Sequence, residues 1–281
     1  MAKQPVKVKQ QVPATTTSKA ERVARMKETA GQGISTKATD NLVPLIGVLQ
    51  PLSPQALTKN QAYIKGAEAG DFYARALGTP VLSGGEGIWF QPCGMYSEWV
   101  EWVPRDQGGG FVGRHDYNDG SPPKGAKAKP RPEGSRKPQA YTMGKNDLVD
   151  TRYVPGNLWL EGQAYAFVIP FTSTGHAVAR GWMTKQSGEQ ENGSILASYN
   201  CLYKLTTRST KNNLGEWYKI DVGAPVRLFT PEGDINEEAE EIVGNCDKAF
   251  ELGKQLYTSF ERKEKTAAAE EARGEQDEDQ L

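Results

Sequence analysis

Hydrophobic and polar residues alternate in several short stretches of the chain, which is the pattern of strands buried on one face. The longest stretch covers 88–104. It is dense in aromatic and β-branched residues, and Pro92 and Gly94 predict a bend within it. Shorter strands are predicted at 42–49, 158–172, 176–184, 203–209 and 216–222. The last two are expected to pair as a hairpin around residues 211–215.

The hydrophobic period changes near the C-terminus, where apolar residues from Ile235 to Phe260 recur mostly every three or four positions. This spacing predicts one amphipathic helix over Asp234–Lys263, which covers a face of the sheet or pairs with a second copy of the chain. The expected fold class is therefore α+β and β-dominated. We expect a partly open barrel or curved antiparallel sheet, with long loops and a C-terminal amphipathic helix.

Both ends of the chain have the composition of disordered segments. Residues 1–40 contain almost no large apolar side chains, and residues 1–30 carry seven Lys and Arg against two Glu. Residues 270–281 carry six Asp and Glu against one Arg. Such segments bury too little apolar surface to offset the entropy of ordering. We therefore predict a disordered basic arm at 1–40, a single domain at 41–263 and a disordered acidic tail at 264–281.

The remaining composition argues against several protein classes. Cys93, Cys201 and Cys246 lie far apart without a CxxC pair, so neither a disulfide framework nor a zinc site is expected, and no cofactor or metal is predicted. The chain has no run of 18 apolar residues and its N-terminus is polar, which argues against a membrane helix and a secretory signal. The expected location is the cytoplasm.

Motifs of the common enzyme classes are missing from the sequence. His115 and His176 are the two histidines of the chain, and there is no phosphate-binding P-loop, G-x-S-x-G elbow or HExxH helix. We therefore predict that the protein is not an enzyme. A metal-dependent nuclease built from separated Asp and Glu residues is left open as an alternative.

Aromatic residues are concentrated in the longest predicted strand, where Trp89, Phe90, Tyr96, Trp99 and Trp102 fall within 14 residues. Alternation places Tyr96 and Trp102 on one face of the strand and Trp99 on the other. Rings exposed on a β surface stack on unpaired bases, an interaction of about 1–3 kcal/mol per base. The alternative is that these rings fill the core.

A long irregular loop is predicted at 106–140, which is rich in Gly and Pro. Residues 121–140 carry six Lys and Arg against one Glu, and cations on such a loop can follow a phosphate backbone. The alternative is an ordinary solvated loop. The predicted nucleic-acid-binding residues are Tyr96, Trp99, Trp102, Arg105, Phe111, Arg114, Lys124, Lys127, Lys129, Arg131, Arg136 and Lys137.

Four segments carry a resemblance to a known family. The strongest is Tyr96–Val112, which reads YSEWVEWVPRDQGGGFV, followed by LIGVLQPLSP at Leu45–Pro54 and YIKGAEAGD at Tyr63–Asp71, and a weaker match covers 203–207 and 213–218. These segments resemble a family of tailed-phage single-stranded DNA-binding proteins that are found with replication genes. The resemblance implies an OB-like barrel with elaborations, and a phage-encoded protein would be located in the host cytoplasm.

The expected function is sequence-independent binding of single-stranded DNA in phage replication or recombination. Stacking on aromatic rings and contacts between Lys or Arg and phosphate would hold the strand. Replication or recombination proteins are candidate partners for the acidic tail, and a second copy of the chain is a further candidate. The main alternative is a protein-interaction or scaffold component of phage DNA metabolism, and the second alternative is the nuclease.

Overall fold

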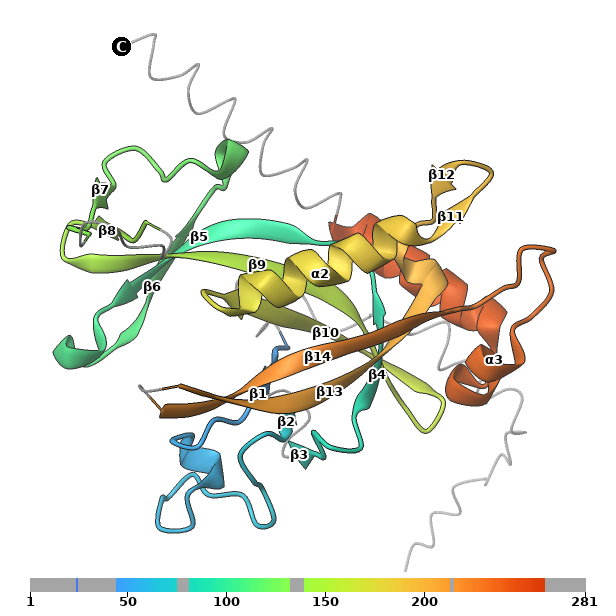
Figure 1. Ribbon diagram of the computed structural model, residues 1–281, viewed down its shortest axis with the longest axis horizontal. Helices are drawn as coiled ribbons and strands as arrows, with labels where there is room; N and C mark the ends of the chain where they lie inside the picture. The colour runs from blue at the N-terminus through green and yellow to red at the C-terminus, as the bar shows by residue number, and fades with distance from the viewer. Residues whose placement is uncertain (1–23, 25–43, 75–80, 132–138, 213–214, 261–281) are drawn as a thin grey trace, which may run out of the picture. The chain divides into compact units, whose positions relative to one another are not determined.

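A computed structural model describes residue 24 and residues 44–74, 81–131, 139–212 and 215–260 of the protein (Figure 1). Apart from Ala24, these residues belong to one compact unit, Val43–Leu281. The predicted acidic tail, and the predicted basic arm except Ala24, lie outside the described residues. No helix in the described ranges is long and apolar enough to cross a membrane.

The largest sheet is antiparallel and runs in the order β14-β13-β4-β9-β5-β6, with β10 and β8 also paired to β9 and β7 paired to β8. Its strands are β4 (Ile88–Pro92), β5 (Tyr96–Val103), β6 (Gly110–His115), β7 (Lys127–Ala128), β8 (Tyr141–Met143), β9 (Asn146–Leu160), β10 (Gln163–Thr172), β13 (Cys201–Asn212) and β14 (Gly215–Arg227). The smaller sheets contain β1 (Ile46–Val48), β2 (Phe72–Ala74) and β3 (Val81–Leu82), and β11 (Gln190–Glu191) and β12 (Ser194–Ile195).

Helical segments are short apart from two. Among residues 44–260, the described α-helices are α2 (Gly175–Gly188), α3 (Glu237–Val243) and a helix over 246–260. The 3-10 turns are η2 (Pro54–Ala56), η3 (Arg105–Gln107), η4 (Asn118–Gly120) and η5 (Ser198–Asn200).

Strand β9 connects the two ends of the large sheet. One of its edges pairs with β5 along 147–153 and then with β4 along 156–159, while its other edge pairs with β8 and then with β10. Gly156 permits this crowding, because a Cβ at this position would lie 2.3 Å from the backbone oxygen of Gln91.

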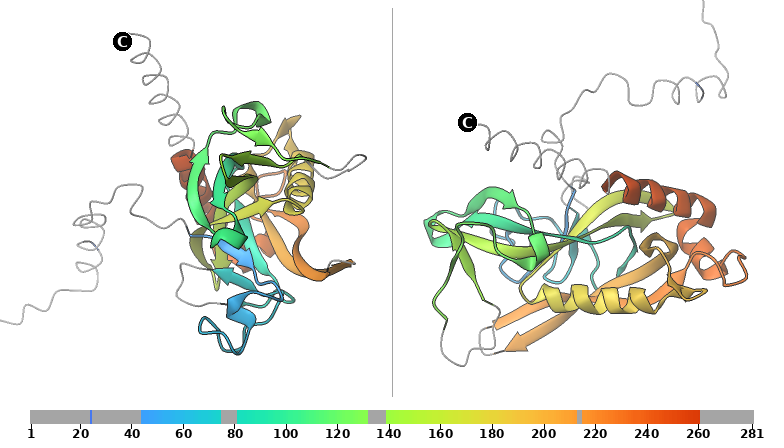
Figure 2. Two further views of the ribbon diagram at one scale, coloured as in Figure 1. Left: turned by 90° about the vertical axis from the view of Figure 1, so that its left-hand side faces the viewer. Right: turned by 90° about the horizontal axis from the view of Figure 1, so that it is seen from above.

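Helices cover both faces of the sheet: α2 lies on one side of the strands and helix 246–260 on the other (Figures 1 and 2). Trp182 of α2 is fully buried in the main core, where its ring meets Phe90 and Tyr203 edge-on. Cys246 and Ala249 of the second helix pack in a separate cluster with Trp159 and other residues. The alternating faces of the strands therefore supply two apolar layers, as their sequence pattern indicates.

The structure confirms the predicted α+β, β-dominated class, with a large antiparallel sheet that does not close. The predicted bend separates β4 from β5, where Gly94 adopts φ 117°. The predicted pairing of 203–209 with 216–222 is confirmed by β13 and β14. The predicted strand at 176–184 is wrong, because these residues belong to α2, whose buried side chains include the polar Gln186.

The prediction of a single helix over Asp234–Lys263 is also wrong. Helix α3 ends at Gly244, which adopts a left-handed conformation with φ 70° and caps the helix through its N–H to the Glu240 carbonyl. The next helix starts directly afterwards, because the Asn245 side chain accepts a hydrogen bond from the Lys248 N–H. The Gly-Asn pair therefore ends one helix and begins the next while the apolar spacing continues through the break.

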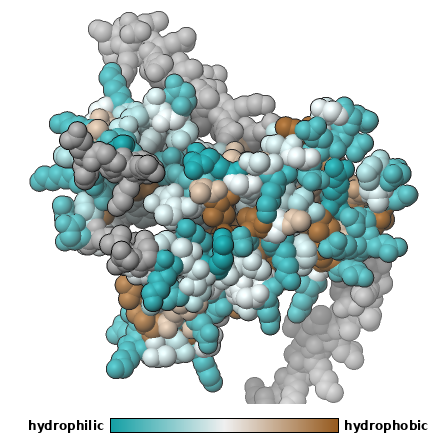
Figure 3. All heavy atoms as spheres, viewed as in Figure 1, coloured by the Kyte–Doolittle hydropathy of each residue, from teal (hydrophilic) through white to brown (hydrophobic). Residues whose placement is uncertain are grey.

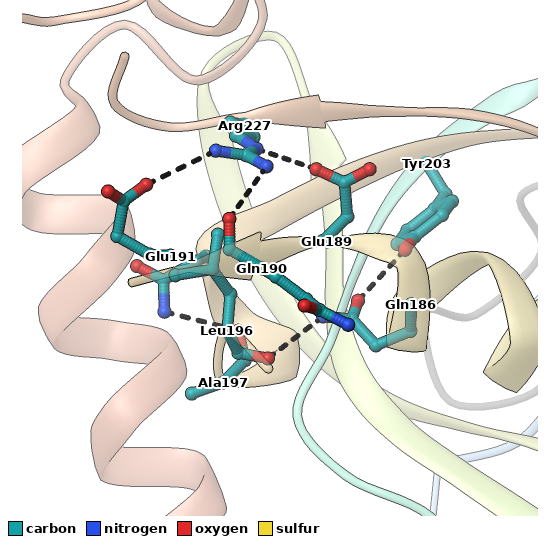
Figure 4. A network of polar contacts seen from close by, with 9 residues as sticks. Gln186, Glu189, Gln190, Glu191, Leu196, Ala197, Tyr203 and Arg227 are labelled. Atoms are coloured by element: carbon teal, nitrogen blue, oxygen red, sulfur yellow. Dashed lines mark hydrogen bonds and ion pairs between the residues drawn. The ribbon is translucent and has the colours of Figure 1, made fainter. Parts of the chain in front are cut away.

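A polar network anchors the end of α2 and the β11–β12 hairpin to β14 (Figure 4). Arg227 Nε lies 2.6 Å from a Glu189 carboxylate oxygen, its second contact is with Glu191 at 3.6 Å, and it also donates to the Gln190 carbonyl. In the same network, the buried Tyr203 hydroxyl donates to Gln186.

We expect Arg227→Met to lower the free energy of unfolding by about 1–2 kcal/mol, because a charge-assisted contact is lost at a site that is only partly exposed. Urea denaturation measures this change, and hydrogen exchange over residues 189–196 should show a loosened hairpin. Arg180→Met, at an exposed position of α2, is the matched control. Equal effects of the two substitutions would contradict the anchoring role of Arg227.

Candidate nucleic-acid interface

Five strands lie side by side at one end of the large sheet, in the order β6-β5-β9-β8-β7 (Figure 1). Residues directly opposite each other in antiparallel strands have side chains on the same face. One continuous row of such partners crosses all five strands. The row consists of Phe111, Trp102, Asp147, Thr142 and Lys127.

The aromatic end of this row is exposed. Trp102 is 41% exposed and Phe111 57% exposed, and their rings meet edge-on with centroids 5.8 Å apart. A bulge on β6 brings the two rings together, because Phe111 and Gly113 oppose consecutive residues of β5 and Val112 is the extra residue. Val112 is itself 47% exposed. The tip of the β5–β6 hairpin therefore presents apolar surface to solvent.

Cations lie on the same face as the two rings. Lys127 ends the row, and Lys129 shares its face two residues further along the chain. Arg114 lies opposite Val100, two residues before Trp102, and so points to the same side. We call the set of Trp102, Phe111, Arg114, Lys127 and Lys129 the aromatic–cation face.

Two of these cations have acidic partners. Arg114 lies 3.1 Å from Glu98 and its guanidinium sits 5.5 Å from the centroid of the Tyr153 ring. Lys129 Nζ lies 2.5 Å from the Asp147 carboxylate. The four side chains of these two pairs are 24–42% exposed. Water therefore screens the attraction, and each carboxylate offsets only part of the positive charge of its partner.

Other predicted cations lie nearby or cannot be placed. Lys124 is exposed and, with Arg114, lines a hollow of about 550 Å³ that also contains the acidic Asp116 and Asp119. Arg131 is exposed. Three of the predicted cations lie outside the described side chains: Arg105, Arg136 and Lys137.

Trp99 lies on the opposite face and is buried, which contradicts its predicted role in stacking. It is 5% exposed, its ring lies against Tyr117 and Tyr141, and its indole N–H donates to the Ser121 carbonyl at 2.8 Å. The segment around Ser121 folds back across the sheet and closes this face. The alternative reading of the aromatic strand, that a ring fills the core, is therefore correct for Trp99.

Tyr96 lies on the predicted face but is covered. Its ring stacks on Tyr153 at 5.0 Å and on Phe260 of helix 246–260 at 6.0 Å. Burial raises the pKa of the Tyr96 phenol. Because neighbouring rings already stack on Tyr96, its predicted contact with a base is not available in this arrangement.

The predicted irregular loop at 106–140 is only partly irregular. Residues Gly110–His115 form β6 and Lys127–Ala128 form β7. Gly108, Gly109 and Gly110 all adopt positive φ and make the turn from β5 into β6. Strand β6 was not predicted because its sequence shows no hydrophobic alternation. Most of its residues are exposed, and the strand is held by backbone pairing with β5.

Glu101 forms the polar centre of the covered face. It is 7% exposed and accepts hydrogen bonds from Asn146 at 2.5 Å and from His115 at 2.9 Å. These two bonds lower the pKa of the Glu101 carboxyl, with the larger contribution from Asn146. A depressed pKa of this kind stabilises the fold above the unfolded-state value of about 4.3, and the stabilisation is lost as pH falls through the folded-state pKa.

The free energy of unfolding of the wild type is expected to fall as the pH drops below about 4.3. We expect Glu101→Gln to make this fall less steep, because glutamine does not titrate. Urea denaturation of both proteins from about pH 7 to about pH 3 measures this difference. Glu86→Gln, at an exposed position, serves as the control. Parallel curves for wild type and Glu101→Gln would show that the carboxyl is not linked to folding.

The described residues contain no group of three or more His, Cys, Asp and Glu placed to hold a metal ion. Cys93, Cys201 and Cys246 are buried and free, and burial raises the pKa of each thiol to about 12. The second histidine, His176 at the start of α2, lies 3.7 Å from Asp150.

Comparison with known protein families matches residues 13–266 to the family described as Pam3 phage gp34-like protein. No curated protein matches the chain, and no solved structure matches it. The family match covers most of the chain, including every strand that the structure describes and the aromatic–cation face. The chain therefore belongs to the Pam3 phage gp34-like family, a family of phage proteins.

Proposed function

We propose that this phage protein binds single-stranded DNA without sequence specificity on the aromatic–cation face, and that it serves phage replication or recombination. The observation that supports the proposal is the placement of two exposed rings, Trp102 and Phe111, in one cross-strand row with Lys127. Unpaired bases stack on such rings irrespective of sequence, while cations beside the rings neutralise phosphates.

The proposed binding residues are fewer than the sequence predicted. Trp102 and Phe111 stack on bases, and Arg114, Lys124, Lys127 and Lys129 contact phosphates. A strand that displaces Glu98 and Asp147 from their cations would exchange a weak surface ion pair for a phosphate contact. Binding by these groups requires no catalytic residue, and strong salt dependence is expected.

Titration with an unlabelled oligonucleotide, followed by tryptophan fluorescence, tests this function. We expect quenching that weakens as salt is added, with the same affinity for unrelated sequences of equal length. The oligonucleotide should be recovered intact after incubation with magnesium. Degradation of the oligonucleotide would favour a metal-dependent nuclease instead.

A protein-interaction component of phage DNA metabolism is a second candidate, because Trp102, Phe111 and Val112 form a continuous exposed apolar tip. Such patches commonly mark protein contacts. This function predicts no fluorescence change with any oligonucleotide, so the same titration separates the two candidates.

A further inference from the structure

A second surface with the chemistry of an anion site lies between α2 and β14. Two adjoining hollows of about 350 Å³ and about 300 Å³ share the lining residues Thr174, Val178, Lys219 and Ile220. We call the two together the α2–β14 groove. Figure 3 shows hydrophobic residues gathered along this furrow between hydrophilic flanks, in the same view as Figure 1.

Positive charge dominates the walls of the groove. Lys185, Arg208 and Lys219 line the hollow of about 300 Å³ together with one carboxylate, that of Asp221, and Lys185 Nζ already donates to the carbonyls of Val222 and Gly223. Arg208 and Lys219 lie directly opposite each other in the β13–β14 ladder, an arrangement that costs stability when no anion lies between the charges. Asp221 offsets little of this repulsion, since it lies 3.9 Å from Arg208 and both side chains are more than half exposed.

The start of α2 and two indole rings also line the groove. It includes the start of α2, where the first turn has no acidic residue and Thr174 makes no side-chain capping bond. Trp182 and Trp217 line the groove, and the indole N–H groups of both are buried without an acceptor among the described residues. Trp182 is 0% exposed. Lys219 Nζ lies 5.3 Å from the centroid of the Trp217 ring.

A phosphate group has the complementary chemistry. Its oxygens accept hydrogen bonds from helix N-terminal N–H groups, indole N–H groups and Lys or Arg at once. Small residues of α2 leave room for a bound polynucleotide. Ala177 and Gly181 line the groove, and a Cβ on Gly181 would meet no atom within 4 Å. The α2–β14 groove can therefore admit a phosphate-bearing chain without rearrangement of α2.

We propose that the α2–β14 groove binds backbone phosphates of single-stranded DNA, as a second contact region beyond the aromatic–cation face. This inference rests on the proposed function, since the same polynucleotide occupies both surfaces. Arg208 and Lys219 supply the charge together with Lys185, whose Nζ also donates to the carbonyls of Val222 and Gly223, and the start of α2 supplies neutral donors. A strand long enough to reach both regions binds more tightly than a short one.

Indole resonances in a spectrum of the ¹⁵N-tryptophan-labelled protein report on the two surfaces separately. Trp217 and Trp182 line the groove and Trp102 lies on the aromatic–cation face, and Trp→Phe variants assign each signal. With a long oligonucleotide we expect all three signals to shift, and with inorganic pyrophosphate a weaker shift of Trp217 and Trp182. Shifts of Trp102 alone would overturn the groove inference and leave the proposed function standing. Shifts of the groove signals alone would overturn the aromatic–cation face as the binding site, and with it the inference that the groove is a second contact region.

Two pairs of matched variants test the groove by affinity. Gly181→Leu places a side chain in the groove, while Gly188→Leu places one in open space at the other end of the same helix. We expect about a tenfold loss of affinity for a long oligonucleotide with Gly181→Leu and none with Gly188→Leu. Equal affinity of the two variants would overturn the inference.

Charge reversal provides the second pair. Lys219→Glu should weaken binding of the long oligonucleotide about tenfold and lower the salt dependence by about one phosphate contact, while leaving a short oligonucleotide almost unaffected. Lys254→Glu, on helix 246–260, is the control, because Lys254 lies outside the groove. A loss of the same size with the control, or with the short oligonucleotide, would contradict a local contact at Lys219.

Discussion

The double substitution Trp102→Ala, Phe111→Ala should weaken binding of single-stranded DNA by about 30-fold or more. Each ring that stacks on a base contributes about 1–3 kcal/mol, so the loss of two rings corresponds to a change of at least that size in the dissociation constant. Fluorescence anisotropy of a labelled oligonucleotide measures the change. The melting temperature should hardly move, because both rings lie at the surface and neither belongs to a core cluster.

The matched control for this experiment is Ile195→Ala. Ile195 is 58% exposed on β12, so its truncation removes a similar apolar side chain from a different surface. We expect its affinity to equal that of the wild type. Unchanged affinity of the Trp102 and Phe111 variant, with the wild type binding normally, would move the stacking surface elsewhere on the protein.

The sequence predicted the aromatic–cation face in part, because its residues depend on local pattern and on pairing between neighbouring strands. Alternation along β5 correctly separates Trp102 from Trp99, and the abundance of Lys in 121–140 indicates the cations. The sequence could not show which face is covered. That depends on a segment 22 residues away, where the Ser121 carbonyl accepts the Trp99 indole N–H. Nor could it place Phe111 beside Trp102, which requires the bulge at Val112.

The two wrong predictions for helical segments, at 234–263 and at 176–184, have local causes in the sequence. Gly244 ends α3 and Asn245 caps the start of helix 246–260. The apolar spacing continues on both sides of this pair, and it therefore favoured the prediction of a single helix. In α2, the buried face includes the polar Gln186, whose amide is satisfied by Tyr203 and by the Leu196 carbonyl. Within 176–184 only Ala179 and Trp182 are buried, and the next position on the same helical face is the polar Gln186, so the helical period was too short and weak to be recognised.

Arg208 and Lys219 of the α2–β14 groove show a further limit of sequence patterns. Arg208 lies between Thr207 and Ser209, so its strand looks like an ordinary solvated face. The predicted hairpin pairs the two strands, but the opposition of Arg208 and Lys219 depends on its register, and their position next to the start of α2 follows only from the tertiary fold. Strand register and tertiary packing therefore create both surfaces that we propose for nucleic-acid binding, while composition indicates only that suitable residue types are present.

Substitution of Gln91 by methionine is expected to cause the largest loss of stability, about 3–6 kcal/mol in the free energy of unfolding. Gln91 is 0% exposed, and its amide joins four partners from different parts of the chain. It donates to the carbonyls of Tyr199 and Ala249 and accepts from the side chains of Asn157 and Trp159. Methionine has a similar size but removes all four hydrogen bonds, and each buried group left without a partner costs about 1–3 kcal/mol.

The position of these partners makes the effect global rather than local. Gln91 lies on β4, Asn157 and Trp159 lie on β9, and Ala249 lies on helix 246–260, so the amide holds a helix onto two strands. Small domains are stable by about 5–15 kcal/mol, so Gln91→Met should remove a large part of the total. Urea denaturation measures the loss, with Gln61→Met at an exposed position as the control. A loss of less than about 1 kcal/mol for Gln91→Met would show that the four groups find other partners when the amide is gone.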